Sequence, residues 1–127
     1  MKSLGYDPKL PQDDSVYEYQ CPVIYALDII GGKWKLPILW HLADKKMVRY
    51  NELKRSVKGI TNMMLTKCLR ELEEHGLVER IQFQEIPPHV EYSLTERANQ
   101  LLPALKKLYK WGEEQIKFAN TLNDHKG

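Results

Sequence analysis

The sequence contains little that would support secretion or membrane insertion. Its 127 residues include two cysteines, which are too few for a disulfide framework. No apolar run approaches the roughly 20 residues that a membrane-spanning helix needs. The polar, acidic residues 1–20 do not have the pattern of a secretory signal. We therefore expect a cytoplasmic protein that does not contact a membrane.

Motifs for the common kinds of catalysis are also missing. Gly32-Lys33 lacks the first glycine and the final Ser or Thr of a phosphate-binding loop, and no Gly-x-Ser-x-Gly is present. The four histidines have no metal-ligand spacing with one another or with the cysteines. Cys21 could in principle pair with a remote histidine, but nothing in the sequence places the two together. We predict that the protein is not an enzyme and uses no cofactor or metal.

Positive charge is concentrated in one stretch of the chain. Residues 45–70 hold eight lysines and arginines against one acidic residue, whereas residues 71–96 hold seven acidic residues against one arginine. The net charge of the whole chain is only +2. This distribution predicts a polyanion-binding surface in the middle of the chain, with the acidic segment turned away from it. The alternative is an ordinary solvated face whose charges the next segment offsets.

The hydrophobic periodicity predicts a mainly α protein with a small β-hairpin, an α+β fold. Thr61 is a good N-cap for one helix, and Gly76 is its expected stop. Pro103 is expected to bend the last helix or to mark the start of a separate segment. The expected helices are 22–30, about 34–43, 51–57, 61–75 and 96–120, and the expected strands are 77–86 and 90–95, with a short strand or extended link at 47–50.

This order of elements is that of a winged helix-turn-helix domain with flanking dimerisation helices. A helix fits the major groove of B-DNA, and a hairpin beside it can reach phosphates or the minor groove. We interpret residues 1–20 as an N-terminal arm and residues 21–127 as a single domain. Within it, the expected recognition helix spans about 61–75, the wing about 77–95 and the C-terminal dimerisation helix about 96–120.

Several short motifs between residues 21 and 112 resemble the HxlR family. They include Cys21-Pro22, GGKW at 31–34, MLT at 64–66, PPHVEYSLT at 87–95 and Trp111. The resemblance implies a homodimeric winged-helix transcription regulator of the MarR-like type that binds a pseudo-palindromic operator in double-stranded DNA. Met63 and His89 depart from the family pattern, since relatives often carry Lys or Arg at both positions. We therefore expect a different operator preference and a weaker or pH-sensitive grip on phosphate at the wing tip.

Candidate DNA contacts follow from this interpretation. The candidates for base edges are Asn62, Met63, Thr66 and Lys67, on the face of helix 61–75 opposite its apolar stripe. The candidates for phosphates are Lys33, Arg49, Lys54, Arg55, Lys58, Arg70 and His89. Arg49 could instead hold the start of its helix, and Lys33 could be an ordinary surface lysine.

The last helix carries an apolar stripe that is wider than one small domain needs. With residues of the first helix, it predicts a homodimer interface. The residues of this predicted interface are Ile24, Leu27, Leu101, Leu105, Leu108, Trp111 and Ile116. The alternative is burial within one subunit.

Cys21 is the candidate for a signal-sensing residue. It precedes Pro22 at a helix N-terminus, which stabilises thiolate. The resemblance suggests that Cys21 senses oxidants or electrophiles. The alternative is a small buried residue, as most free cysteines are. Cys68 is expected to be a poor disulfide partner because it lies on the apolar stripe of helix 61–75.

The residues leave two other functions open. A winged helix that binds protein or RNA would use its last helix as a docking surface and would ignore DNA sequence. A regulator gated by a small non-redox ligand would bind an apolar effector near Tyr109 and Trp111.

Overall fold

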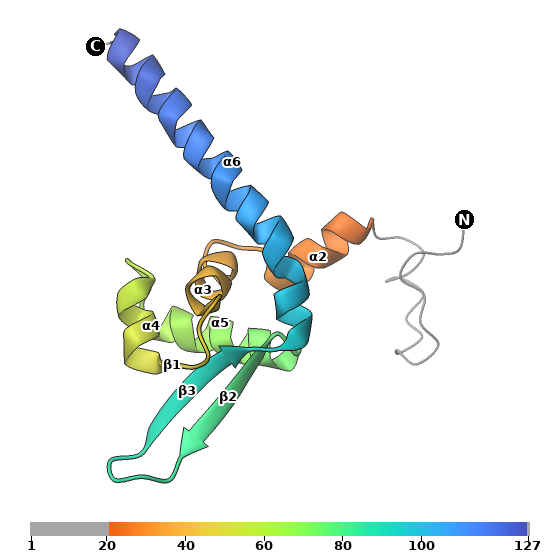
Figure 1. The fold of residues 1–127 in the computed structure, drawn as a ribbon, viewed down its shortest axis with the longest axis vertical. Helices are drawn as coiled ribbons and strands as arrows, with labels where there is room; N and C mark the ends of the chain where they lie inside the picture. Colours follow the sequence, from red (N-terminus) through yellow and green to blue (C-terminus); the bar gives the residue numbers. More distant parts are fainter. Residues whose placement is uncertain (1–20, 127) are drawn as a thin grey trace.

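The computed structural model describes residues 21–126 and shows a mainly helical chain with one small sheet (Figure 1). This arrangement confirms the predicted fold class, and the predicted N-terminal arm lies outside the described residues. None of the described helices is both long and apolar enough to cross a membrane. The elements are α2 (Pro22–Ile30), α3 (Lys35–Leu42), β1 (Val48–Arg49), α4 (Tyr50–Ser56), α5 (Asn62–Glu74), β2 (Val78–Phe83), β3 (His89–Leu94) and α6 (Glu96–Lys126).

The three strands form an antiparallel sheet in the order β1-β3-β2. β2 and β3 pair from Val78 opposite Leu94 to Phe83 opposite His89. The predicted hairpin is therefore present, but β2 is shorter than the expected 77–86, and β3 begins and ends one residue earlier than the expected 90–95. His89 is the first residue of β3 and not part of the connection between the strands. The connection between the two strands, at the end of the wing, therefore consists of residues 84–88.

Local signals in the sequence determine both ends of α5. The Thr61 hydroxyl accepts a hydrogen bond of 3.1 Å from the Met64 amide, which satisfies one of the free amides of the first turn. At the other end Gly76 has a φ of +74°, and the Leu77 amide donates to the Leu72 carbonyl at 2.9 Å. This glycine-dependent stop turns the chain from α5 into β2.

The core holds α5 in place from one side. Its apolar stripe packs against α3 and α4 and against the sheet, and no side chain of the stripe is more than slightly exposed. Because this face is fixed by burial, the opposite face of α5 is held toward solvent. The core residues of α5 are Leu65, Cys68, Leu69 and Leu72, and the same buried cluster includes Ile38, Leu39, Leu42, Val48, Leu53 and Val78.

α6 is one continuous helix that runs through Pro103, so a separate segment starting at that proline is wrong. Its first turns pack on the body, and its remainder extends away from the domain at the end opposite the wing (Figure 1). Leu105 is 6% exposed and belongs to the core of the single chain. Of the predicted interface residues, Leu105 is thus already covered within one subunit, and Leu101 is partly covered.

Candidate nucleic-acid interface

α4, the following turn and α5 form the helix-turn-helix. Gly59 in the turn has a φ of +90°, and the apolar residues Leu53 and Leu65 bury the facing sides of the two helices. The predicted base contacts all lie on the exposed side of α5. Met63 is the most prominent of them, because its apolar side chain is 83% exposed. The structure therefore brings Asn62, Met63, Thr66 and Lys67 together on one solvent-facing surface.

Tyr50 links the two helices, and sequence reasoning missed it. Its hydroxyl donates to the Asn62 carbonyl at 3.1 Å and lies 3.0 Å from the Thr66 hydroxyl. These contacts hold the first turns of α5 and orient two of the predicted base-reading side chains. The only signal in the sequence was a tyrosine at the start of a short helix, and such a residue is usually assigned to packing.

The predicted phosphate contacts come from several elements. Lys54 and Arg55 lie in the last turn of α4, and Lys58 follows in the turn before α5. The Lys33 ammonium lies 4.7 Å from the centre of the Trp34 ring, just before α3. Arg49 is the N-cap residue of α4, but its side chain makes no capping hydrogen bond. Its side chain therefore does not cap that helix.

The acidic residues are not all turned away from this surface, contrary to the prediction. Glu71 forms ion pairs with Lys35 at 3.0 Å and with Lys67 at 3.9 Å. The hydrogen bond from Lys35 is the main reason why the pKa of Glu71 lies below its ordinary value. Glu85 lies in the 84–88 connection and Glu91 in β3, so both belong to the wing.

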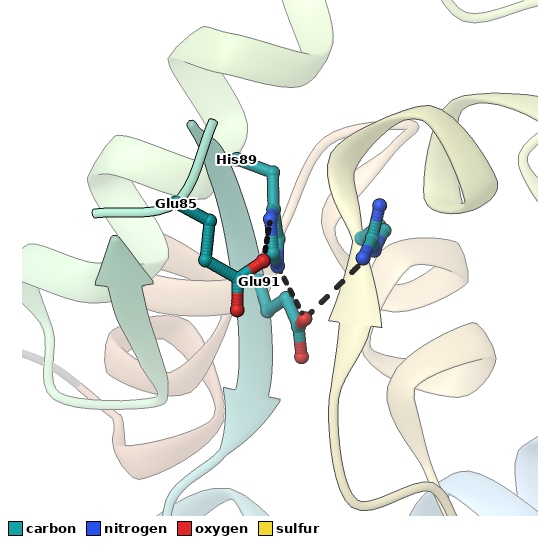
Figure 2. A network of polar contacts seen from close by, with 4 residues as sticks. Glu85, His89 and Glu91 are labelled. Carbon is teal, nitrogen blue, oxygen red and sulfur yellow. Dashed lines mark hydrogen bonds and ion pairs between the residues drawn. The ribbon is translucent and has the colours of Figure 1, made fainter. Parts of the chain in front are cut away.

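His89 lies between these two wing carboxylates (Figure 2). Its Nε2 is 2.8 Å from Glu91 Oε2, and its Nδ1 is 3.6 Å from Glu85 Oε2. The ring also stacks on Phe83 at a centroid distance of 4.7 Å. Glu91 in turn pairs with Arg49 at 3.8 Å. The predicted position of His89 in the connection at the wing tip is therefore wrong, because it is the first residue of β3, and its side chain is only 16% exposed and is engaged within the wing.

The two cysteines differ in accessibility. Cys21 is exposed and caps α2, where its carbonyl accepts a 3.0 Å hydrogen bond from the Tyr25 amide. Cys68 is buried, as predicted, and burial raises the pKa of its thiol. Cys21 is thus the accessible thiol of the described residues, and burial disfavours the thiolate of Cys68.

An apolar surface without a covering element extends over α2 and α6. α2 has no buried residue, although most of its side chains are apolar. The predicted interface residues Ile24, Leu27, Leu108, Trp111 and Ile116 are all exposed, and Trp111 is 60% exposed. A groove of about 450 Å³ lies between the two helices and includes Leu27, Leu101 and Leu108 in its walls. Surfaces of this kind mark interaction sites.

Comparisons with known proteins agree with this geometry. Residues 29–120 match the family model described as HxlR-like helix-turn-helix. The chain is 45% identical over 97 residues to the regulatory protein MalR of Fusobacterium mortiferum, covering 76% of this chain and 92% of MalR. The redox regulator HypR in its reduced form superposes with a TM-score of 0.73 at 42% identity, covering 80% of this chain and 99% of that structure. The reduced form of the transcriptional regulator YodB from B. subtilis superposes with a TM-score of 0.64 at 30% identity, covering 75% and 93%.

Proposed function

Because this chain belongs to the HxlR family of DNA-binding winged helix-turn-helix transcriptional regulators, we propose that it binds a pseudo-palindromic operator as a homodimer. The observation that carries the proposal is the solvent-facing side of α5, which is polar except for the highly exposed Met63 and is held rigidly by the core behind it. In this proposal, α5 enters the major groove of double-stranded DNA and the β2–β3 wing lies beside it.

Four side chains of α5 are proposed to contact base edges. Asn62 can bond to adenine, Thr66 can bond to several bases, and Lys67 can donate to guanine. Met63 has no hydrogen-bonding capacity comparable to these and suits the methyl group of thymine. Because the Tyr50 hydroxyl already holds Thr66 and the backbone at Asn62, the first turns of the helix would lose little conformational freedom on binding.

The basic side chains around α5 are proposed to contact phosphates. Arg55, Lys58 and Arg70 are exposed. Arg49 is exposed as well, but its guanidinium forms an ion pair with Glu91. His89 contributes least in this proposal, since both ring nitrogens face carboxylates. The full set is Lys33, Arg49, Lys54, Arg55, Lys58, Arg70 and His89.

A second copy of the chain is proposed to cover the apolar surface of α2 and α6. An α6 that leaves its own domain after Leu105 can pack along the same helix of a partner, which brings two recognition helices into a symmetric pair. The symmetry of such a dimer would match two half-sites of the operator. Ile24, Leu27, Leu108, Trp111 and Ile116 supply the contacts, and Leu101 and Leu105 support them from the walls of the groove.

Oxidation of Cys21 is the proposed signal. The exposure of this thiol and the redox regulator HypR among the similar structures support the idea. A thiol-specific oxidant such as diamide would take two electrons and two protons from a pair of Cys21 thiols on the two protomers and leave one disulfide. The other cysteine of the chain, Cys68, is buried. A bond between the subunits would change the spacing of the recognition helices.

A small apolar ligand is the second candidate signal. A pocket of about 330 Å³ opens between α3 and α6, with Pro37, Trp40, His41 and Tyr109 among its lining residues. Trp40 and Tyr109 stack in its wall with ring centroids 4.3 Å apart. Pockets of this size and composition accept small aromatic or aliphatic molecules. Such a ligand would act on the same helix that carries the proposed interface.

Selection of bound duplexes from a random pool, with the protein reduced and then treated with diamide, tests both proposals. The expected result is a two-fold symmetric enriched site that is lost or shifted on oxidation by the wild type but not by Cys21→Ser. A site that is unchanged when the wild type is oxidised contradicts the thiol switch and leaves the ligand as the candidate signal. A site that responds to oxidant equally in Cys21→Ser contradicts a switch at Cys21. No enriched site in the reduced protein contradicts the operator proposal and favours a protein- or RNA-binding winged helix.

A further inference from the structure

Arg80 is the one basic residue in the otherwise acidic 71–96 segment, and no role has been assigned to it so far. It lies in the middle of β2, where it pairs with Tyr92 of β3. Because side chains alternate along a strand, Arg80 shares the face of the buried Val78 and not that of its neighbours in sequence. That face is the one packed toward α5, so Arg80 extends beside the recognition helix.

A polar crevice lies between α5 and the wing. It measures about 310 Å³ and is lined by Thr66, Arg70, Glu73, Arg80 and Tyr92. The two arginines come from its two sides, one from α5 and one from β2. Among residues 21–126, neither has a carboxylate within 4.0 Å of its guanidinium nitrogens. Two guanidinium groups that form no ion pair with a described residue thus share one hollow.

Tyr92 forms the buried side of the crevice. Burial raises the pKa of its phenol, and the guanidinium of Arg80 beside it acts in the opposite direction. Tyr92 is the cross-strand partner of Arg80, so the ring lies beside the arginine on the same face of the sheet. An arginine held in this way presents its planar donors with less loss of freedom than a free surface arginine. Glu73 is the single carboxylate of the crevice and opposes the binding of an anion there.

The geometry of B-DNA indicates which anion would occupy the crevice. The major and the minor groove are separated by one sugar-phosphate backbone. If α5 occupies the major groove and the wing reaches the adjacent minor groove, that backbone must pass between α5 and β2. This is where the crevice opens. We propose that the crevice binds a phosphodiester of this strand, with Arg70 and Arg80 as its ligands and the Thr66 hydroxyl beside them.

This inference rests on the proposed DNA binding and adds to it a site and a residue. Arginine suits the role because its guanidinium matches phosphate oxygens in a bidentate geometry. The proposal also makes Glu73 a restraint on affinity, so that two substitutions in one crevice should act in opposite directions. A purely structural role for either residue would not produce that pattern.

The test measures duplex affinity against salt concentration for Arg80→Gln, Glu73→Gln and the control Lys110→Gln. Lys110 is exposed on α6, on the side opposite its apolar stripe. Arg80→Gln should bind about tenfold more weakly and lose about one unit from the slope of log K against log salt. Glu73→Gln should bind a few-fold more tightly, and Lys110→Gln should match the wild type. Thermal unfolding of each variant checks that the fold is intact.

Single methylphosphonate substitutions along a duplex selected by the wild type then locate the contact. Neutralising the phosphate between the two grooves should weaken the wild type and Lys110→Gln equally, but should weaken Arg80→Gln clearly less, because only Arg70 still contacts that phosphate in this variant. An Arg80→Gln variant with wild-type affinity and slope overturns the crevice proposal alone, as does a Glu73→Gln variant that binds no more tightly than the wild type. A wild type that binds no duplex overturns the proposed function and this site with it.

Discussion

Replacement of Leu108 by Glu should give a folded monomer. Leu108 is 48% exposed in the single chain, so about half of its side chain is left for a partner to cover. Complete burial of a leucine is worth about 1.5–3 kcal/mol. The uncovered half therefore contributes roughly 0.7–1.5 kcal/mol per subunit. A two-fold interface contains the residue twice, which makes the loss about 1.5–3 kcal/mol, or a 10- to 100-fold weaker dimer.

The glutamate itself adds to this loss. Its charge would have to leave water to form the interface, and an unpaired buried charge costs several kcal/mol. The fold should persist, because about half of this side chain is already in solvent in the monomer, where the carboxylate of a glutamate can stay in water. Leu105→Ala makes the contrast, since Leu105 is 6% exposed and its loss should lower the free energy of unfolding by about 2–5 kcal/mol.

Sedimentation velocity over a range of concentrations measures the effect. The wild type and the control Lys110→Glu should sediment as dimers, whereas Leu108→Glu should sediment as a monomer with an unchanged circular dichroism spectrum. A dimer of wild-type stability in Leu108→Glu would refute the assignment of this surface. A wild type that is monomeric throughout would refute the homodimer.

Three further substitutions probe the recognition helix and its support. Tyr50→Phe removes the hydroxyl that holds the start of α5 and should lower the free energy of unfolding in urea by about 1 kcal/mol; an unchanged value would mean that water replaces the hydroxyl. Met63→Lys should change the enriched sequence in a random-pool selection, and an unchanged preference would remove Met63 from the base contacts. Glu71→Gln tests the ion pair with Lys35, which lowers the pKa of Glu71 below its ordinary value of 4.5. A carboxyl group whose pKa is lowered by folding stabilises the fold at pH values above its ordinary pKa, and this stabilisation disappears as the pH falls through the lowered pKa. The variant should therefore lose less stability than the wild type between about pH 5 and pH 3. Parallel curves of unfolding free energy against pH would contradict this.

Much of the interface could be predicted from the sequence because its signals are local. The spacing of apolar residues every three or four positions along 61–75 determined which side of α5 faces solvent. Thr61 and Gly76 determined where that helix begins and ends. The cap of α6 was predictable in the same way, since the Thr95 hydroxyl accepts from the Ala98 amide three residues later at 3.3 Å.

Some expectations were wrong where distant segments meet. The apolar stripe of α6 is continuous in the sequence, yet Leu105 lies in the core of its own chain while Leu108, one turn later, is exposed. The pattern of the sequence does not show at which residue α6 stops packing on its own domain. His89 was expected in the connection with Pro87 and Pro88, but its pairing with Phe83 makes it the first residue of β3.

The sequence by itself determined the order of elements, the exposed face of α5 and the concentration of basic residues around it. Each of these depends on the period of one helix or strand, or on a cap only a few residues away. Only the tertiary structure decided that Tyr50 holds the start of α5, that Glu91 joins His89 to Arg49, and that Arg80 faces Arg70 across a crevice. Apart from the pair within β3, these contacts join different elements, from Arg70 and Arg80, which are 10 positions apart, to Arg49 and Glu91, which are 42 positions apart. Their geometry arises from how the helices and strands pack together, which no local pattern records.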